Sequence, residues 1–302
     1  MKYFKTEASR ASKRHIITAE SFERVTERKF PFEQSNSKGK FSQYGICPSC
    51  LNPIQLIGIS HEVKVSSHGK HTGKTIEGFP EWKQMKYKYC PYAKNGAYVA
   101  PDNDTLLPTI DKDVIALYDM LLHEFDRVVY VIEKDFDFRG SKNFWKKALQ
   151  RYIENKVYCY PWLTESNLPY IFALRGIHQI NCIRQKFRID SDPYKALSLL
   201  PDIIWEESEK PDYYYLSNKP GKYINLIFRL TNHKQKAIDG NALIESLEYC
   251  IDDKNTMKTI FKKKIEFDET FFTNLIQNKS STYRREDLLK ITEQMPRLQM
   301  TH

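Results

Sequence analysis

The sequence predicts an α+β fold made of three consecutive regions. Residues 1–100 form a basic region punctuated by Cys, Gly, Pro and His. Residues 101–200 carry apolar residues at helical spacing, and residues 201–302 mix the alternating pattern of strands with further helical spacing. Because 302 residues exceed what one hydrophobic core usually needs, we expect more than one domain.

The first region is expected to contain one short helix and little other regular structure. This helix lies within residues 16–32, with Thr18 or Ser21 as its N-cap, and residues 35–40 follow as an open loop. Residues 44–92 have short apolar runs separated by Cys, Gly, Pro and His, which is typical of a small unit organised by a metal ion.

The middle region is expected to be helical. After a linker at residues 95–108, one long helix begins at an N-cap, Asp111. Its buried face repeats every three to four residues: Leu117, Tyr118, Leu121, Leu122, Phe125, Val128, Val129 and Ile132. Ser141 caps a second helix, Pro169 opens a third, and residues 194–200 form a short fourth.

The last region mixes strands and helices. Strands are expected at residues 212–216, 222–230 and 259–267, the first two being joined by the turn sequence Ser-Asn-Lys-Pro-Gly. Helices are expected at residues 241–251, from an N-cap at Asp268 to Ile276, and at residues 285–294.

Net positive charge is confined to the first hundred residues. Residues 1–100 contain 17 Lys and Arg against 8 Glu and no Asp, which gives +9, whereas the remaining 202 residues contain 30 basic and 30 acidic residues. Such a segment favours a polyanionic partner, with nucleic acid as the leading class. The alternative is a basic face that serves only solubility.

The chain lacks membrane and export signals. No stretch approaches the roughly 20 apolar residues of a membrane span, and the N-terminal segment lacks the apolar core of a signal peptide. We therefore expect a cytoplasmic protein that makes no membrane contact.

Cysteine and histidine spacing predicts one metal site in the first region. Cys47-Pro-Ser-Cys50 is a knuckle whose turn directs two thiolates at one ion, and Cys90, again followed by Pro, supplies a third. His71 is the expected fourth ligand, with His68 as its substitute. Intervals of 20 and 18 residues separate His71 from Cys50 and Cys90. We expect Zn²⁺ in a small zinc-knuckle unit, followed by a helical middle and a mixed α/β C-terminal region.

The other three cysteines are isolated from one another in the sequence. Cys159, Cys182 and Cys250 stand in aromatic or apolar surroundings, so they are interpreted as small buried hydrophobic residues. Six cysteines in a chain of this length are too few for a disulfide scaffold.

Lysines and aromatic residues alternate beside the expected metal site. Cations there would pair with phosphates and rings would stack on bases. The candidate nucleic-acid-binding residues are Lys70, Lys74, Trp82, Lys83, Lys86, Tyr87, Lys88 and Tyr89. The alternative is a strand with tyrosines on one face and solvated lysines on the other.

No residue is assigned a catalytic role. The chain has neither GxGxxG nor GxxxxGK[ST] phosphate loops, and no HExxH or HxE motif. Alternating carboxylates at Glu133, Asp135 and Asp137 would converge on Mg²⁺ if they lay on a strand, but the pattern favours the polar end of a helix.

These features favour a zinc-containing nucleic-acid-binding protein with an accessory or recognition role rather than an enzyme. DNA and RNA both stay open, and a protein partner would contact the neutral remainder. Frequent Lys, Ile, Asn and Tyr suit an AT-rich microbe or mobile element, and a role in phage defence is consistent with that composition. One alternative is an HNH-like metal-dependent nuclease using His61, His68 or His71. Another is a protein-interaction subunit with a purely structural zinc ion.

Overall fold

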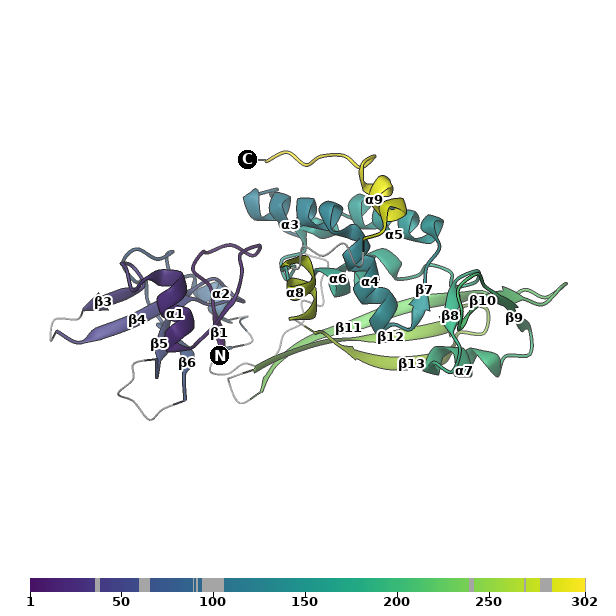
Figure 1. Cartoon of the computed structure of the whole chain (residues 1–302), viewed down its shortest axis with the longest axis horizontal. Coiled ribbons are helices and arrows are strands. Elements are labelled where there is room, and N and C mark those ends of the chain that lie inside the picture. Colours follow the sequence, from purple (N-terminus) through teal and green to yellow (C-terminus); the bar gives the residue numbers. More distant parts are fainter. Residues whose placement is uncertain are drawn as a thin grey trace. The chain divides into compact units, whose positions relative to one another are not determined.

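The computed structural model describes residues 1–35, 39–59, 66–88, 90, 92–93, 106–238, 242–268, 270–277 and 284–301. The fold is mixed α+β, as predicted, with helices and antiparallel sheets (Figure 1). The chain forms two compact units. The first unit comprises Met1–Asp102 with Lys234–Glu245, and the second comprises Asn103–His233 with Ser246–His302.

The first unit is built on a four-stranded antiparallel sheet that the sequence analysis did not anticipate. Its elements are β1 (Tyr3–Phe4), β2 (His15–Ile16), α1 (Ala19–Thr26), β3 (Glu33–Ser35), β4 (Phe41–Ile46), β5 (Pro53–Ile57), β6 (His68–His71) and α2 (Gln84–Lys88). The sheet order is β3-β4-β5-β6, and β1 pairs with β2. Alternating apolar side chains of β5, Ile54 and Leu56, face a core that also contains Phe4, Phe22 and Cys47.

The expected first helix forms, but over fewer residues. Thr18 is its N-cap, because the Ser21 N–H donates to Thr18 Oγ1 at 3.1 Å; Ser21 itself is a buried residue inside α1. The helix ends at Glu27, where the backbone turns left-handed (φ 49°). The spacing of apolar residues in this segment does not predict that the helix ends before residue 32.

The second unit contains the expected middle helices. They are α3 (Lys112–His123), α4 (Phe125–Asp135), α5 (Lys142–Glu154), the 3-10 turn η1 (Val157–Cys159), α6 (Leu168–Phe172), the π-helical turn η2 (Ala173–Ile177) and α7 (Asp192–Ser198). Asp111 and Ser141 are N-caps as predicted: the Val114 N–H donates to Asp111 Oδ1 at 2.8 Å and the Phe144 N–H to Ser141 Oγ at 3.2 Å. The short fourth helix begins earlier than expected, after its N-cap Ser191.

The prediction of one long helix after Asp111 is wrong, because the chain breaks at Glu124 into α3 and α4. The two halves share α9 as a neighbour, but α3 also packs on η1, whereas α4 packs on α6 and α8. A change of direction at Glu124 allows both apolar faces to be buried. Its carboxylate accepts hydrogen bonds from Arg127 and Arg284, each at 2.8 Å.

The strands of the second unit form two sheets. They are β7 (Phe138–Arg139), β8 (Lys186–Arg188), β9 (Ile203–Glu207), β10 (Tyr213–Asn218), β11 (Leu226–Ile238), β12 (Ala242–Asp253) and β13 (Lys258–Glu266). One sheet has the order β7-β8-β10-β9 and the other β11-β12-β13, with the helices α3 to α6 on one side of the latter (Figure 1). The strands predicted at residues 212–216 and 222–230 both exist, but they belong to different sheets.

The predicted helix at residues 241–251 is wrong, because this segment is strand β12. The spacing of its apolar residues is compatible with both a helix and a strand. In the strand, Leu247, Tyr249 and Ile251 lie on one side, and each is at most 1% exposed. Pairing of β12 with β13, for example Leu247 opposite Ile265, satisfies its backbone groups. Tertiary pairing therefore overrides a local helical pattern.

The predicted C-terminal helices form. They are α8 (Phe271–Gln277) and α9 (Glu286–Thr292). The Asp268 carboxylate accepts from the Phe271 N–H at 3.0 Å, as expected of an N-cap. None of the helices in the described ranges is long and apolar enough to cross a membrane.

Aromatic side chains form the centre of the second unit. The ring of Phe138, on β7, lies 4.6 Å from Phe228 and 5.8 Å from Trp145, between centroids, and Phe228 lies 6.0 Å from Tyr249. All four side chains are fully buried. Two sheets and helix α5 therefore share one core.

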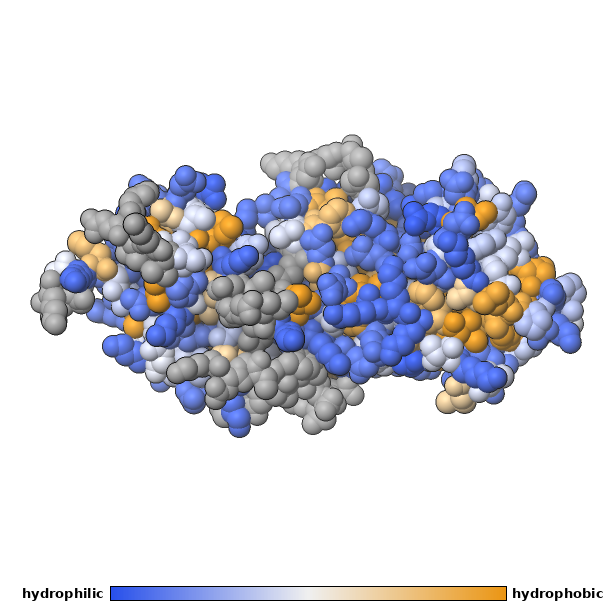
Figure 2. All heavy atoms as spheres, turned by 90° about the horizontal axis from the view of Figure 1, so that it is seen from below, coloured by the Kyte–Doolittle hydropathy of each residue, from blue (hydrophilic) through white to orange (hydrophobic). Residues whose placement is uncertain are grey.

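The surface is largely hydrophilic, in keeping with a mean hydropathy of −0.60. On the face shown in Figure 2, hydrophilic residues cover most of the surface, and apolar residues gather mainly at the end of the second unit that holds α7. Exposed large apolar side chains elsewhere in the described ranges are scattered, as is ordinary for a folded protein.

His178, just after η2, should make the second unit sensitive to acid. The Leu230 N–H donates to His178 Nδ1 at 3.1 Å, which ties η2 to β11. Burial lowers the pKa of His178, and the positive charges of Arg151, Arg175 and Arg229 add to this effect. Because the unfolded chain then binds the proton more readily, this stability is present above the usual histidine pKa of about 6.5 and is lost as pH falls below it.

We expect His178→Gln to flatten the decline of the melting temperature between about pH 7.5 and 5.5, the range around the usual histidine pKa. The comparison uses the slope against pH, so that any general destabilisation by the substitution cancels. The corresponding variant in the first unit is His15→Gln. Burial and the positive charges of Lys13 and Arg24 lower the pKa of His15 as well. A His178→Gln slope equal to that of the unaltered chain would contradict the prediction.

Candidate metal centre

The hairpin between β4 and β5 positions Cys47 and Cys50. The last paired residues are Ile46 and Pro53, so residues 47–52 form the connecting loop. The Leu51 N–H donates to the Cys47 carbonyl at 3.1 Å, and Leu51 has a left-handed backbone (φ 60°). This tight turn brings the two thiols to one side of the loop.

Strand β6 and the end of α2 supply the other two side chains. His71 is the last residue of β6 and lies opposite Ile54 on β5, one residue beyond Pro53, so it reaches the same end of the sheet as the cysteine loop. Cys90 follows α2, and its N–H donates to the Tyr87 carbonyl at 2.9 Å. Three separate segments thus converge at one sheet end.

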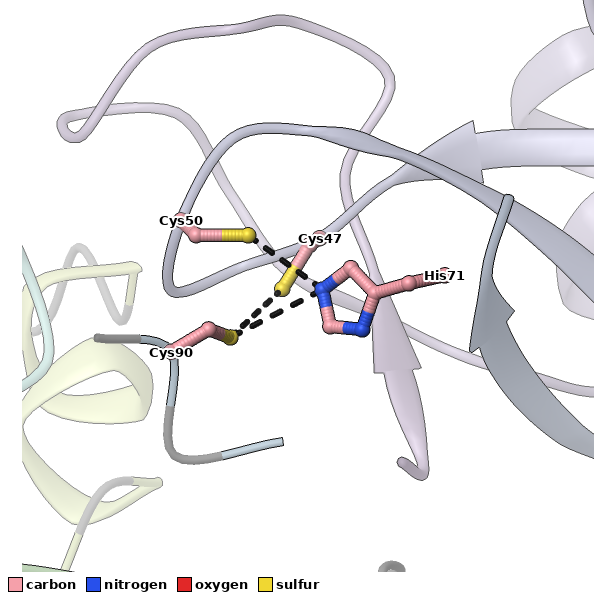
Figure 3. Close-up of side chains that lie close together, drawn as sticks. All are labelled: Cys47, Cys50, His71 and Cys90. Atoms are coloured by element: carbon pink, nitrogen blue, oxygen red, sulfur yellow. Dashed lines mark hydrogen bonds between the residues drawn. The ribbon is translucent and has the colours of Figure 1, made fainter. Parts of the chain in front are cut away.

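The side chains of Cys47, Cys50, His71 and Cys90 point at a common centre (Figure 3). Their ligand atoms all lie within 4.8 Å of one another. Cys47 Sγ is 3.7 Å from Cys90 Sγ, and His71 Nε2 is 3.2 Å from Cys50 Sγ and 3.6 Å from Cys90 Sγ. These four residues could hold a metal ion, and they are the four singled out by their spacing in the sequence.

These separations fit tetrahedral coordination. Bonds of about 2.3 Å to sulfur and about 2.0 Å to nitrogen put ligand atoms about 3.5–3.8 Å apart around one ion. A disulfide would require about 2.05 Å between sulfurs, and Cys47, Cys50 and Cys90 are all free thiols. The three cysteines are at most 6% exposed, while His71 is partly exposed.

Burial sets the protonation of the thiols. It raises the pKa of Cys47 and of Cys90 above the ordinary cysteine range. Burial acts in the same direction on Cys50, but hydrogen bonds with Cys47, Cys90 and His71 outweigh it and lower the pKa of Cys50. One thiolate is therefore favoured among three buried sulfurs, and a cation at their centre would stabilise all three as thiolates.

Asn52 is a member of this centre that sequence reasoning missed. It is 1% exposed, its carbonyl accepts from the Cys47 N–H at 2.9 Å, and its Nδ2 lies 3.5 Å from Cys50 Sγ. The available signal was a polar residue two positions after the knuckle and directly before the apolar run of β5.

Two of the candidate nucleic-acid-binding residues, Trp82 and Tyr87, lie beside His71. The ring centroids of Trp82 and Tyr87 lie 6.0 and 5.0 Å from that of His71. The Trp82 N–H donates to Thr75 Oγ1 at 3.0 Å, which joins the loop after β6 to the segment before α2. We call the set Lys70, Lys74, Trp82, Lys83, Lys86, Tyr87 and Lys88 the lysine–aromatic surface; its lysines are exposed and its rings partly exposed.

The structure does not support the alternative strand around Lys86 and Lys88 or the substitute ligand His68. Lys86 and Lys88 belong to the short helix α2, so the suggested strand with alternating lysines and tyrosines is wrong. His68, the substitute ligand, begins β6 and points its Nδ1 at the Ser66 carbonyl at 2.8 Å, outside the cluster. Tyr89 and His61 lie outside the described residues.

The acidic run of α4 does not form a second metal centre. Glu133 accepts from Trp145 Nε1 at 3.2 Å, and Asp135 accepts from the Tyr170 hydroxyl at 2.7 Å. Asp137 pairs with Arg188 at 3.1 Å. The three carboxylates thus serve separate contacts. Within the described ranges, the cysteine–histidine group is the one cluster with metal-binding geometry.

No protein-family model, no curated protein and no solved structure matches this chain. Functional inference therefore depends on the residues of the centre and of its surroundings.

Proposed function

We propose that the first unit binds one Zn²⁺ ion through Cys47, Cys50, Cys90 and His71. The observation that carries this proposal is the convergence of three sulfurs and one imidazole nitrogen within 4.8 Å. Three thiolates and an imidazole are ligands that Zn²⁺ prefers, and harder cations such as Mg²⁺ prefer oxygen ligands.

The proposed zinc ion is structural. Four protein ligands complete a tetrahedral shell and leave no position for a water nucleophile. The ion would instead cross-link the β4–β5 loop, the end of β6 and the segment after α2. In a unit whose strands and helices are all short, such a cross-link contributes directly to folding.

We further propose that this unit binds nucleic acid through the lysine–aromatic surface. Exposed lysines such as Lys83 and Lys86 can neutralise phosphates, while Trp82 and Tyr87 offer partly exposed rings for contact with bases. The excess of positive charge in residues 1–100 supports the same partner. The role is recognition or accessory binding, because the centre lacks an open ligand position.

The test is binding of the zinc-loaded chain to labelled single- and double-stranded DNA and RNA over a salt series. We expect the double variant Lys86→Ala/Lys88→Ala to reduce the slope of log affinity against log salt by up to about two units, at about 0.9 per lost phosphate contact. The loss should be similar for different sequences, because phosphate contacts carry no sequence information.

Lys146 and Lys147 of α5 provide the matched control, since they are adjacent, exposed lysines of the second unit. Their double alanine variant removes the same charge and should keep the original salt slope. An unaltered slope in Lys86→Ala/Lys88→Ala would place the contact surface elsewhere. Weak binding that vanishes in moderate salt for every polymer would refute nucleic-acid recognition.

A further inference from the structure

Asn52 holds the segment that carries the lysine–aromatic surface. Its Oδ1 accepts from the Lys83 N–H at 2.7 Å, and its Nδ2 donates to the Lys83 carbonyl at 3.0 Å. One side-chain amide therefore satisfies both backbone polar groups of Lys83. Because Asn52 is buried, these bonds are shielded from competition with water.

The same residue contacts the proposed ligand loop. Its Nδ2 also lies 3.5 Å from Cys50 Sγ, as a donor to a sulfur, and its backbone carbonyl accepts from the Cys47 N–H. N–H groups that point at metal-bound sulfurs orient them and stabilise their negative charge. Asn52 thus contacts both the metal centre and the segment that bears Trp82, Lys83 and α2.

A second connection runs through the rings. His71 meets Tyr87 edge-on, with 5.0 Å between centroids and 69° between ring planes, and Trp82 lies 5.1 Å from Tyr87. The orientation of the His71 imidazole would be set by the metal ion, and that imidazole packs against both rings of the surface. Metal binding and the arrangement of the surface therefore share the same side chains.

We infer that Asn52 is a positioning residue that couples metal binding to nucleic-acid binding, an inference that rests on the proposed function. Zinc fixes the cysteine loop, Asn52 transmits that geometry to Lys83, and the lysine–aromatic surface adopts its binding arrangement. Linkage makes the coupling reciprocal: zinc raises the affinity for nucleic acid, and nucleic acid raises the affinity for zinc by the same factor.

The test compares Asn52→Ala with the unaltered full-length chain in two titrations. One measures the zinc Kd by competition with a chromogenic chelator. The other measures the Kd for a labelled single-stranded DNA of mixed sequence, with zinc in excess so that the site is full. We expect zinc affinity to fall about 10- to 100-fold, as for other residues that support metal ligands. DNA affinity should fall by at least about fivefold, within the usual range of coupling.

Asn52→Asp is the second variant, should the alanine variant fail to fold. It keeps an acceptor for the Lys83 N–H but loses both donations, and we expect it to weaken both affinities as well. Co²⁺ substitution adds a readout, because loss of the Nδ2 contact should shift the cobalt–thiolate absorption. The control is Asn155→Ala, since Asn155 is an exposed residue at the end of α5 in the second unit whose Nδ2 donates to the Arg151 carbonyl; it should change neither affinity.

The two titrations distinguish the outcomes that would contradict the coupling. If zinc affinity falls while DNA affinity at full zinc occupancy equals that of the unaltered chain, the coupling is absent and Asn52 supports the metal alone. If neither affinity changes, Asn52 has no positioning role. If the unaltered zinc-loaded chain binds no DNA or RNA at any salt concentration, the proposed nucleic-acid function fails and the coupling falls with it, whereas the zinc titration still reports on the metal centre.

Discussion

Replacing Cys47 by serine should abolish metal binding and unfold the first unit. Cys47 is fully buried and is one of the four proposed ligands, and serine lacks the soft thiolate that Zn²⁺ prefers. The apparent binding energy of structural zinc is about 10–16 kcal/mol in small zinc units, which equals or exceeds the stability of many small domains. Cys90→Ser should act in the same way, since Cys90 is the proposed ligand of the segment after α2.

Two measurements check this prediction: the metal content per chain after dialysis, and hydrogen exchange of the amides of β4, β5 and β6. Both should change together, because the proposed ion would cross-link the β4–β5 loop, the end of β6 and the segment after α2. Either variant retaining one zinc per chain with an unchanged melting curve would refute the proposed centre.

The histidines provide a matched pair for the same experiment. His71→Ala should lose zinc, because His71 Nε2 lies among the three sulfurs. His68→Ala should retain it, because His68 points its Nδ1 at the Ser66 carbonyl. Cys250→Ser is the control for cysteine loss as such, since Cys250 lies on β12 outside the cluster. Equal zinc loss in His68→Ala and His71→Ala would show that the imidazole ligand is assigned wrongly.

Trp145→Ala should be the most damaging single substitution in the second unit. The indole is fully buried, stacks on Phe138 and meets Phe144 at 90°, and its Nε1 donates to the Glu133 carboxylate at 3.2 Å. Truncation leaves a large cavity in the shared aromatic core, for which about 3–5 kcal/mol of unfolding free energy is the usual loss. It also removes a hydrogen bond from a buried carboxylate.

Urea unfolding followed by circular dichroism, with hydrogen exchange of α5 as a local probe, measures this loss. Trp145→Phe separates the two contributions: it retains most of the volume and removes the donor to Glu133, so we expect about 1–3 kcal/mol. Leu199→Ala is the control, because Leu199 is 84% exposed, and it should change stability by no more than about 0.5 kcal/mol. A Trp145→Ala midpoint equal to that of Leu199→Ala would contradict the expected role of this core.

Local chemistry made part of the structure predictable from the sequence. The caps Asp111 and Ser141 act through side-chain bonds within three residues, so they can be recognised without knowledge of the fold. The helical stripe of α5 and the alternation of β13 are equally local. The Cys-Pro-x-Cys knuckle belongs to the same category, because its geometry is that of a single turn.

Long-range contacts decided the features that the sequence left ambiguous or hid. Strand β12 has a pattern compatible with a helix, and the ladder with β13 made it a strand. The helix expected after Asp111 breaks at Glu124; both halves contact α9, but α3 also packs on η1 and α4 on α6 and α8. The sheet of the first unit was missed since its strands are short and interrupted by Gly and Pro.

The four proposed ligands also show which features the sequence predicts and which depend on the tertiary structure. Residue chemistry and spacing alone predicted that Cys47, Cys50, Cys90 and a nearby histidine come together in a cluster that could hold a metal ion. The spacing favoured His71 over His68, and the tertiary structure gives the physical reason: the register of β5 and β6 places His71 opposite Ile54, at the end of the sheet where the cysteine loop lies. The role of Asn52 was hidden, since its partner Lys83 is 31 residues away and only folding brings the two together.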